Sequence, residues 1–144
     1  MNFSPHNYQS YAIDYIETHP VAAVLLDMGL GKTVISLTAI ADLLFDSFEA
    51  HRVLVVAPLR VARDTWPAEL AKWQHLKHLT YAVAVGTVKE RKAALSADAD
   101  ITIINRENQR EALLSAAQKY ISVEPQRYIE WVKKTEAKIR PAKE

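Results

Sequence analysis

The chain has 144 residues, which is enough for one domain with a single hydrophobic core. Its formal net charge of +1 gives no bulk attraction to nucleic acid, so any such site has to be a local patch. It contains no cysteine, which excludes a disulfide framework and a zinc–cysteine site, and no apolar run approaches the roughly 18 residues that would span a membrane. The default expectation is therefore a cytoplasmic protein.

The first part of the chain alternates between helical and strand patterns. Residues 5–17 carry an apolar stripe at helical spacing, and residues 21–26 form a continuous apolar run, typical of a strand buried on both faces of a parallel sheet. A periodic segment over residues 32–46 predicts the next helix. The alternation then continues to residue 104 with a strand at 53–57, a helix at 61–74, a strand at 81–85, a short charged helix at 87–96 and a strand at 101–104. Pro67 either starts the helix at 61–74 anew or kinks it.

This order predicts an α/β fold with a parallel, doubly wound sheet and right-handed crossovers. Ligands of such sheets bind at the carboxyl ends of the strands. Residues 27–33, 58–60 and 105–108 each follow a predicted strand, so we expect them to line one edge of the sheet.

Residues 27–33, Asp-Met-Gly-Leu-Gly-Lys-Thr, are the most informative stretch, and we name them the glycine loop. The chain has only three glycines, and Gly29 and Gly31 lie here, between a predicted strand and a predicted helix. Glycine permits positive φ and a close approach of backbone N–H groups to an anion, so the pattern predicts a phosphate cradle. Lys32 would contact the phosphates, and the hydroxyl of Thr33 would complete a Mg²⁺ shell. The alternative is a turn that merely joins strand to helix.

The pattern changes after residue 108. Residues 109–119 and a segment starting near Pro125 read as helices, so residues 109–144 are expected to form a helical C-terminal extension. Lysines and arginines in its last turns suit either a solvated helix end or a basic face for nucleic acid. Elsewhere, Trp66 and Trp73 share a helical face, which favours core packing, while His75 and His78 read as partly exposed residues rather than metal ligands.

Residues 1–108 resemble the N-terminal RecA-like lobe of a Swi/Snf-like helicase, a superfamily-two relative of the DEAD/DEAH-box proteins. The form of the glycine loop is closest to phage and bacterial members. Four ordered motifs carry the resemblance: Pro5-His6-Asn7-Tyr8-Gln9, the glycine loop, Val53-Leu54-Val55-Val56-Ala57-Pro58 with Trp66, Glu69 and Trp73 after it, and Ile101-Thr102-Ile103-Ile104-Asn105-Arg106-Glu107-Asn108.

The resemblance implies a DNA-dependent ATPase or translocase that uses ATP and Mg²⁺ on double-stranded DNA. By position, Gln9 would recognise adenine. Nucleotide would contact the loop through Met28, Gly29, Leu30, Gly31, Lys32 and Thr33, with Lys32 and Thr33 catalytic and Thr33 the metal ligand. DNA would contact Arg60, Asn105 and Arg106. In such a family the location would be the cytoplasm of a bacterium or a phage-infected host.

One family element is missing from these 144 residues. The family holds Mg²⁺ and the attacking water with an Asp-Glu pair after an apolar strand, and the sequence contains no Asp-Glu dipeptide. We therefore expect the chain to bind ATP but to hydrolyse it poorly alone. Three interpretations remain open: a fragment of a longer helicase, a stand-alone interaction or regulatory module, or one half of a motor whose sheet a protein partner completes or covers.

Overall fold

The computed structural model describes residues 1–108, and the helices expected over 109–144 lie outside the described residues. Residues up to Arg106 form one compact unit. From residue 53 onward its strands and helices alternate as the sequence predicts. No helix within 1–108 combines the length and apolarity that a membrane span requires. The α/β class is therefore confirmed.

The first half of the unit is helical. Helix α1 (Asn7–Thr18) starts at His6, whose backbone N–H donates to the side chain of Gln9 at 2.9 Å. Helix α2 (Lys32–Phe45) starts directly after Gly31, which has a left-handed φ of 81°. The two helices pack together through a small core of Ile13, Ile35 and Ala39, with Leu26 against it.

The second half supplies the sheet. Strand β1 (Val53–Ala57) leads into a π-helical turn (Val61–Thr65) and α3 (Trp66–Lys72), followed by a 3₁₀ turn (Gln74–Leu76). Strand β2 (Tyr81–Ala84), helix α4 (Val88–Ser96), strand β3 (Ile101–Asn105) and a last 3₁₀ turn (Arg106–Asn108) complete the described part. Pro67 lies in the first turn of α3, directly after the π-helical turn. Thr65 and Trp66 at this junction both have right-handed helical backbone, so the segment stays helical through it.

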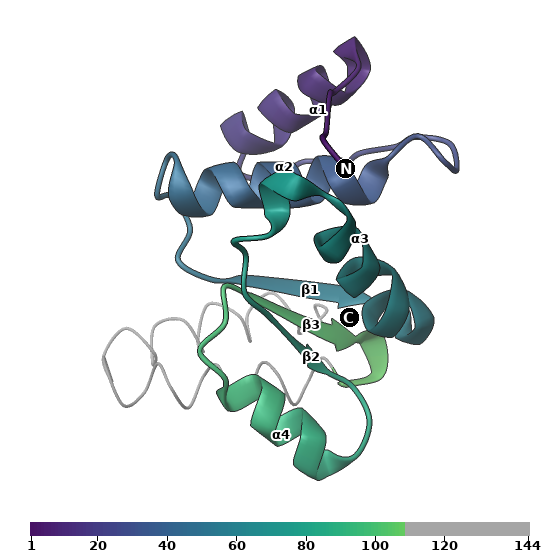
Figure 1. The fold of residues 1–144 in the computed structure, drawn as a ribbon, viewed down its shortest axis with the longest axis vertical. Coiled ribbons are helices and arrows are strands. Elements are labelled where there is room, and N and C mark those ends of the chain that lie inside the picture. Colours follow the sequence, from purple (N-terminus) through teal and green to yellow (C-terminus); the bar gives the residue numbers. More distant parts are fainter. Residues whose placement is uncertain (109–144) are drawn as a thin grey trace, which may run out of the picture. The chain divides into compact units, whose positions relative to one another are not determined.

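The three strands form one parallel sheet with the order β1-β3-β2. Val55 and Val83 both align with Ile103 of the central strand. Figure 1 shows α2 and α3 above these strands and α4 below them, so helices flank the sheet as a doubly wound arrangement requires. The main core joins one sheet face to α2 and α3, with Trp66 and Trp73 packed against it, which confirms the packing role expected for both tryptophans.

Residues 21–26 do not form the strand that the sequence predicts. They have no regular secondary structure and pair with no strand of the described sheet, and Val21 and Leu25 are 86% and 91% exposed. An apolar run becomes a strand only when a neighbour accepts its backbone hydrogen bonds. Within residues 1–108 no such neighbour is present, so the prediction of a fourth strand is wrong for the described structure.

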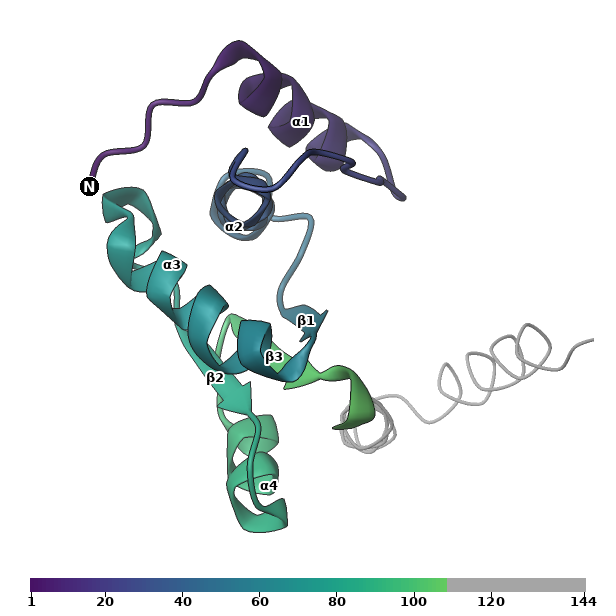
Figure 2. The same cartoon turned by 90° about the vertical axis from the view of Figure 1, so that its right-hand side faces the viewer.

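The N-terminus is fixed to the end of α3. The carbonyl of Met1 accepts a hydrogen bond from the backbone N–H of Gln74 at 2.9 Å. The ring of Phe3 meets the edge of Trp73 at 5.4 Å and stacks on His75 at 5.2 Å between ring centroids. The path from Met1 to α1 therefore joins the sheet layer to the helix that carries Gln9, as the two views in Figures 1 and 2 show.

Candidate functional site

The glycine loop places its two glycines in the conformation that the sequence predicts. Gly29 has φ 84° and Gly31 has φ 81°, both in the left-handed region that favours glycine. Gly31 is also the residue that caps α2, and no side chain accepts from the first turn of this helix. The N–H groups of that turn therefore face outward together with the positive end of the helix dipole, which is the arrangement that binds anions.

The side chain of Lys32 folds back and contacts the backbone at the start of the loop. Its ammonium group donates to the carbonyl of Leu26 at 2.6 Å and to the carbonyl of Asp27 at 2.9 Å. These contacts hold a cation beside the N–H groups of the helix end. They involve neutral carbonyls in an exposed position, so an anion with full charge can replace them as the stronger acceptor.

Gln9 packs directly against the loop. Its side-chain Nε2 donates to the carbonyl of Leu30 at 3.3 Å, and its Oε1 accepts from the backbone N–H of His6 at 2.9 Å. The residue is only 6% exposed. A Cβ added at Gly31 would lie 2.7 Å from Gln9 Nε2, so this glycine is required by the neighbouring amide as well as by its own φ.

Tyr8 makes a contact that the sequence analysis missed. Its hydroxyl donates to the same carbonyl of Leu30 that Gln9 contacts, also at 3.3 Å. The first turn of α1 thus holds the middle of the glycine loop with two side chains. Adjacent residues point in different directions from a helix, so helical periodicity alone gave no signal that Tyr8 and Gln9 share an acceptor.

The outer side of the loop leaves room for a ligand. A Cβ built at Gly29 meets no atom within 4 Å, and Met28 is 95% exposed. Thr33 lies in the first turn of α2, next to Lys32, and is partly buried. Outward N–H groups, a lysine ammonium, a hydroxyl and open space fit the phosphates and Mg²⁺ of a nucleotide. The adenine role of Gln9 and the metal role of Thr33 stay predictions.

The residues expected at the DNA edge follow two paired strands. Ala57 of β1 aligns with Asn105 of β3, so both strands end at one edge of the sheet. Arg60 follows β1 and is exposed, while Asn105 is 7% exposed and Arg106 is exposed beside it. The sheet therefore brings these three residues together, as predicted. The N-terminal end of α2 lies towards the same end of the strands, although residues 21–26 are not part of the sheet (Figure 1).

A second feature lies at the other end of α1. The carboxyl of Glu17 is in hydrogen-bonding contact with Asp42 of α2, and burial, followed by the charges of Asp42, Asp14 and Asp46, raises the pKa of Glu17 to about 7. Its Oε1 is buried without a hydrogen-bond donor. Burial and the neighbouring carboxylates both disfavour the ionised form of Glu17, and this raises its pKa. Within residues 1–108 no group of three His, Cys, Asp or Glu side chains could hold a metal ion.

His75 faces the same region from the turn after α3. Its Nε2 bonds the hydroxyl of Thr38 at 2.9 Å, and burial lowers its pKa, so the ring is neutral at physiological pH.

Comparison with known proteins agrees with this loop and sheet. The model of the SNF2-related domain matches residues 17–131, which is more than half of the chain. The chain belongs to the SNF2-related domain family. It is also 38% identical over 107 residues to protein p41 of Acyrthosiphon pisum secondary endosymbiont phage 1, a match that covers 74% of this chain and 23% of that protein. The chain thus spans about a quarter of the relative's length.

Proposed function

We propose that the glycine loop binds the phosphates of ATP with Mg²⁺, and that the chain is the ATP-binding, RecA-like lobe of a DNA-dependent ATPase or translocase. The observation that carries this proposal is the end of α2. Two left-handed glycines, outward backbone N–H groups and the ammonium of Lys32 converge there, with no side chain capping the helix.

Each loop residue has a separate part in this proposal. Lys32 exchanges the carbonyls of Leu26 and Asp27 for the β- and γ-phosphates, because a charged acceptor binds an ammonium more strongly than a neutral one. The hydroxyl of Thr33 ligates Mg²⁺. Bound Mg²⁺ neutralises phosphate charge during phosphoryl transfer. Gln9 uses one amide hydrogen of Nε2 to contact Leu30 and one lone pair of Oε1 to contact His6. The second hydrogen and the second lone pair of this side chain would contact the adenine edge.

DNA contacts are assigned to the edge formed by Arg60, Asn105 and Arg106. Both arginines are exposed where two paired strands end, and a guanidinium binds phosphate oxygens well. The family match supports DNA as the partner. Residues 1–144 contain no Asp-Glu pair to position a water, so we propose that these residues bind ATP and turn it over slowly by themselves.

A second candidate function is that of a helicase-derived module that binds a protein partner. The observation that favours it is the exposed apolar run at residues 21–26, of which Val21 and Leu25 are almost fully accessible. The two functions are compatible, since the run and the outer side of the glycine loop are separate surfaces.

The proposal is tested by substituting Lys32→Ala and measuring ATP–Mg²⁺ binding by calorimetry. A charge-assisted hydrogen bond contributes about 1.5 to 3 kcal/mol, so affinity should fall roughly 10- to 100-fold. Lys89→Ala, which removes an exposed lysine on α4, is the matched control and should bind ATP as wild type does. Equal affinity of Lys32→Ala and wild type, with unfolding curves that coincide, would reject the phosphate cradle.

A further inference from the structure

A cavity of about 710 Å³ lies at the C-terminal end of α1. Its walls come from the end of α1, the chain that follows it, α2 and the loop after α2. Within residues 1–108, no residue of the glycine loop lines it. Small-molecule sites in proteins have volumes of about 300 to 1,000 Å³, so the cavity has the size of a ligand site that is separate from the proposed phosphate site.

Part of the cavity surface is aliphatic. Ile16 of α1 and Ile40 and Leu43 of α2 line it, together with Val24 from the chain between the two helices. All four side chains are only partly buried, so they keep apolar surface in contact with water. A ligand with an apolar body would remove that surface from water, which is favourable.

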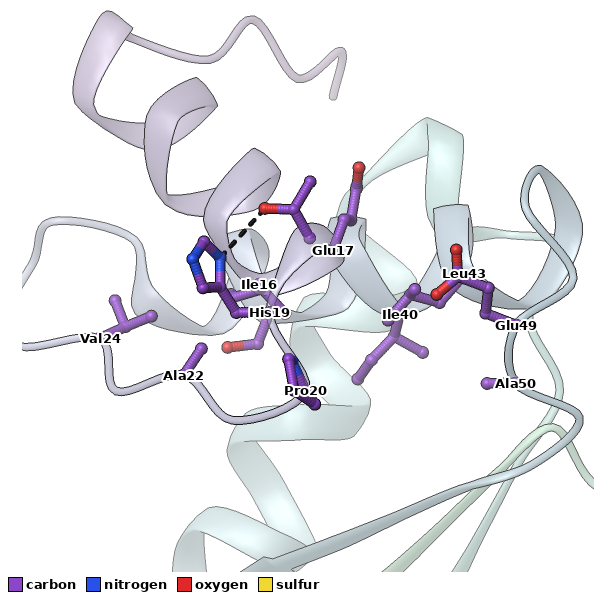
Figure 3. Close-up of a pocket in the computed structure, with 12 residues that line it drawn as sticks. Ile16, Glu17, His19, Pro20, Ala22, Val24, Ile40, Leu43, Glu49 and Ala50 are labelled. Carbon is purple, nitrogen blue, oxygen red and sulfur yellow. Dashed lines mark hydrogen bonds between the residues drawn. The ribbon is translucent and has the colours of Figure 1, made fainter.

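Two glutamates border this aliphatic surface. Figure 3 shows Ile40 between Glu17, at the end of α1, and Glu49, in the loop after α2. Oε1 of Glu17 is buried and accepts no hydrogen bond within the described part of the chain. None of the residues 1–108 that line the cavity is a lysine or an arginine, and neither glutamate forms an ion pair with another described residue.

The loop that carries Glu49 is held against α2. The backbone N–H of Ala50 donates to the carbonyl of Leu43 at 3.1 Å. Phe48 has a left-handed φ of 55°, which is uncommon for a residue other than glycine and turns the chain back towards the helix. The backbone of Glu49 is therefore fixed beside the cavity by its two neighbours.

The end of α1 favours positive charge in the same place. Its last turn contains no basic residue, and the C-terminal end of a helix carries the negative end of the helix dipole. Together with the two glutamates, this makes a cation the favoured ligand. An anion such as a nucleotide phosphate is disfavoured for the same reason.

We propose that this cavity binds an aliphatic diamine, with its methylene chain on Ile40 and one ammonium group at each of Glu17 and Glu49. A purely apolar ligand would leave both carboxylates without a partner. A metal ion would leave the aliphatic surface in water, and residues 1–108 hold no group of three acidic or histidine side chains that fits one. A diamine satisfies both parts of the cavity, because ammonium groups donate to carboxylates and methylene groups cover aliphatic side chains.

Diamine binding should be coupled to the ionisation of Glu17. Burial, followed by contact with Asp42 and the charges of nearby carboxylates, raises the pKa of Glu17 to about 7. Only the ionised carboxylate pairs with an ammonium group, so affinity should be higher at pH 8 than at pH 6, by up to about tenfold. The titratable groups around Glu17 are Asp14 on its own helix, Asp42 and Asp46 at the end of α2, Glu49 in the loop after α2, His19 after α1, and His75, which lies near Asp42. Glu17→Gln keeps all of these groups, so the part of the pH dependence that it removes belongs to Glu17.

The test is calorimetric titration of the full 144-residue chain with putrescine, cadaverine and hexamethylenediamine. These diamines differ only in the number of methylene groups, and the one that binds most tightly is used for the variants. Titrations contain no nucleotide, so the result is independent of the proposed ATP function. Hexylamine has the same carbon chain as hexamethylenediamine but a single ammonium group, and it should bind about two- to fivefold more weakly than hexamethylenediamine.

The expected result is 1:1 binding that depends on both glutamates. At pH 8, Glu17→Gln should weaken binding about tenfold, and Glu49→Gln about two- to fivefold because Glu49 is exposed. Asp64→Asn is the matched control, since it removes one negative charge from an exposed position in the turn before α3. This variant should bind as wild type does, and unfolding curves that coincide with wild type show that each variant is folded.

Four results would overturn the proposal. The first is no binding of any of the three diamines. The second is equal binding at pH 8 by Glu17→Gln and wild type. The third is an equal loss in Asp64→Asn and Glu17→Gln, because binding would then follow net charge alone. The fourth is equal binding of hexylamine and hexamethylenediamine, because a single ammonium group, such as that of a lysine side chain of a protein partner, would then be sufficient.

Discussion

The contact between Gly31 and Gln9 makes the loop sensitive to a single methyl group. Gly29 and Gly31 have nearly the same φ, 84° and 81°, so alanine at either position meets the same backbone strain. That strain is about 1 to 2 kcal/mol for an L-residue in the left-handed region. The two positions differ in their surroundings, because a Cβ at Gly29 meets nothing within 4 Å while one at Gly31 meets Gln9 Nε2 at 2.7 Å and Val34 Cγ1 at 3.2 Å.

The additional cost at Gly31 can be estimated from what Gln9 loses. The side chain has to move, and it is buried and bonded to the carbonyl of Leu30 and the N–H of His6. Each such bond contributes about 0.5 to 1.5 kcal/mol net, so losing both costs about 1 to 3 kcal/mol. Gly31→Ala should therefore destabilise the fold by about 2 to 5 kcal/mol, and Gly29→Ala by about 1 to 2 kcal/mol.

Urea unfolding followed by tryptophan fluorescence measures both changes, because Trp66 and Trp73 report on the main core. A double-mutant cycle with Gln9→Ala isolates the contact. In that background, the cost of Gly31→Ala should fall towards the cost of Gly29→Ala, and the contact with Val34 Cγ1 at 3.2 Å accounts for the difference that remains. If the two glycine substitutions are equally destabilising in the wild-type background, or if Gln9→Ala leaves their difference unchanged, the amide does not pack on the loop as described.

Two further predictions concern charge. Arg60→Ala should weaken binding to DNA of any sequence and lower the slope of log K against log salt concentration by about one, measured by titration at several salt concentrations. Lys92→Ala, on exposed α4, is the control. An unchanged slope for Arg60→Ala would contradict the proposed contact between Arg60 and a DNA phosphate. Because the pKa of Glu17 is about 7 in the fold against an ordinary 4.5, its protonated form stabilises the fold below pH 4.5, and this is lost as pH rises through 7. Glu17→Gln should flatten the dependence of unfolding free energy on pH between about 5 and 8 by about 1 to 2 kcal/mol after solvent screening. A slope equal to that of wild type would show that the pKa of Glu17 is not raised in the fold.

The sheet could be predicted because its strands carry their own signal. The runs at 53–57, 81–85 and 101–104 are rich in β-branched residues, are ended by Pro58, Gly86 and a polar stretch, and lie within two residues of the observed ends. The position of the edge that we propose for DNA followed from the same signal. Parallel strands end on one side, so Arg60 and Asn105 had to approach each other once the strands were correct.

The run at 21–26 gave an equally strong signal and led to the wrong element. Its composition shows that the residues favour an extended, buried conformation, but pairing depends on a second segment that composition does not reveal. The contacts of Tyr8 and Gln9 with Leu30 were unpredictable for a related reason. They join segments about twenty residues apart and depend on how α1 lies on α2, which is a tertiary property.

Helix α2 connects these features physically. One face carries Leu37, Ala41 and Leu44 into the main core, and another carries Ile35 and Ala39 into the small core with α1. Its first turn carries the N–H groups that we propose to bind phosphate, while Asp42, near its last turn, lies beside Glu17. At its start, α1 contacts the loop that leads into α2 through Tyr8 and Gln9, and at its end it contacts α2 through Glu17. A phosphate that moves the loop should therefore also change how α1 packs on α2.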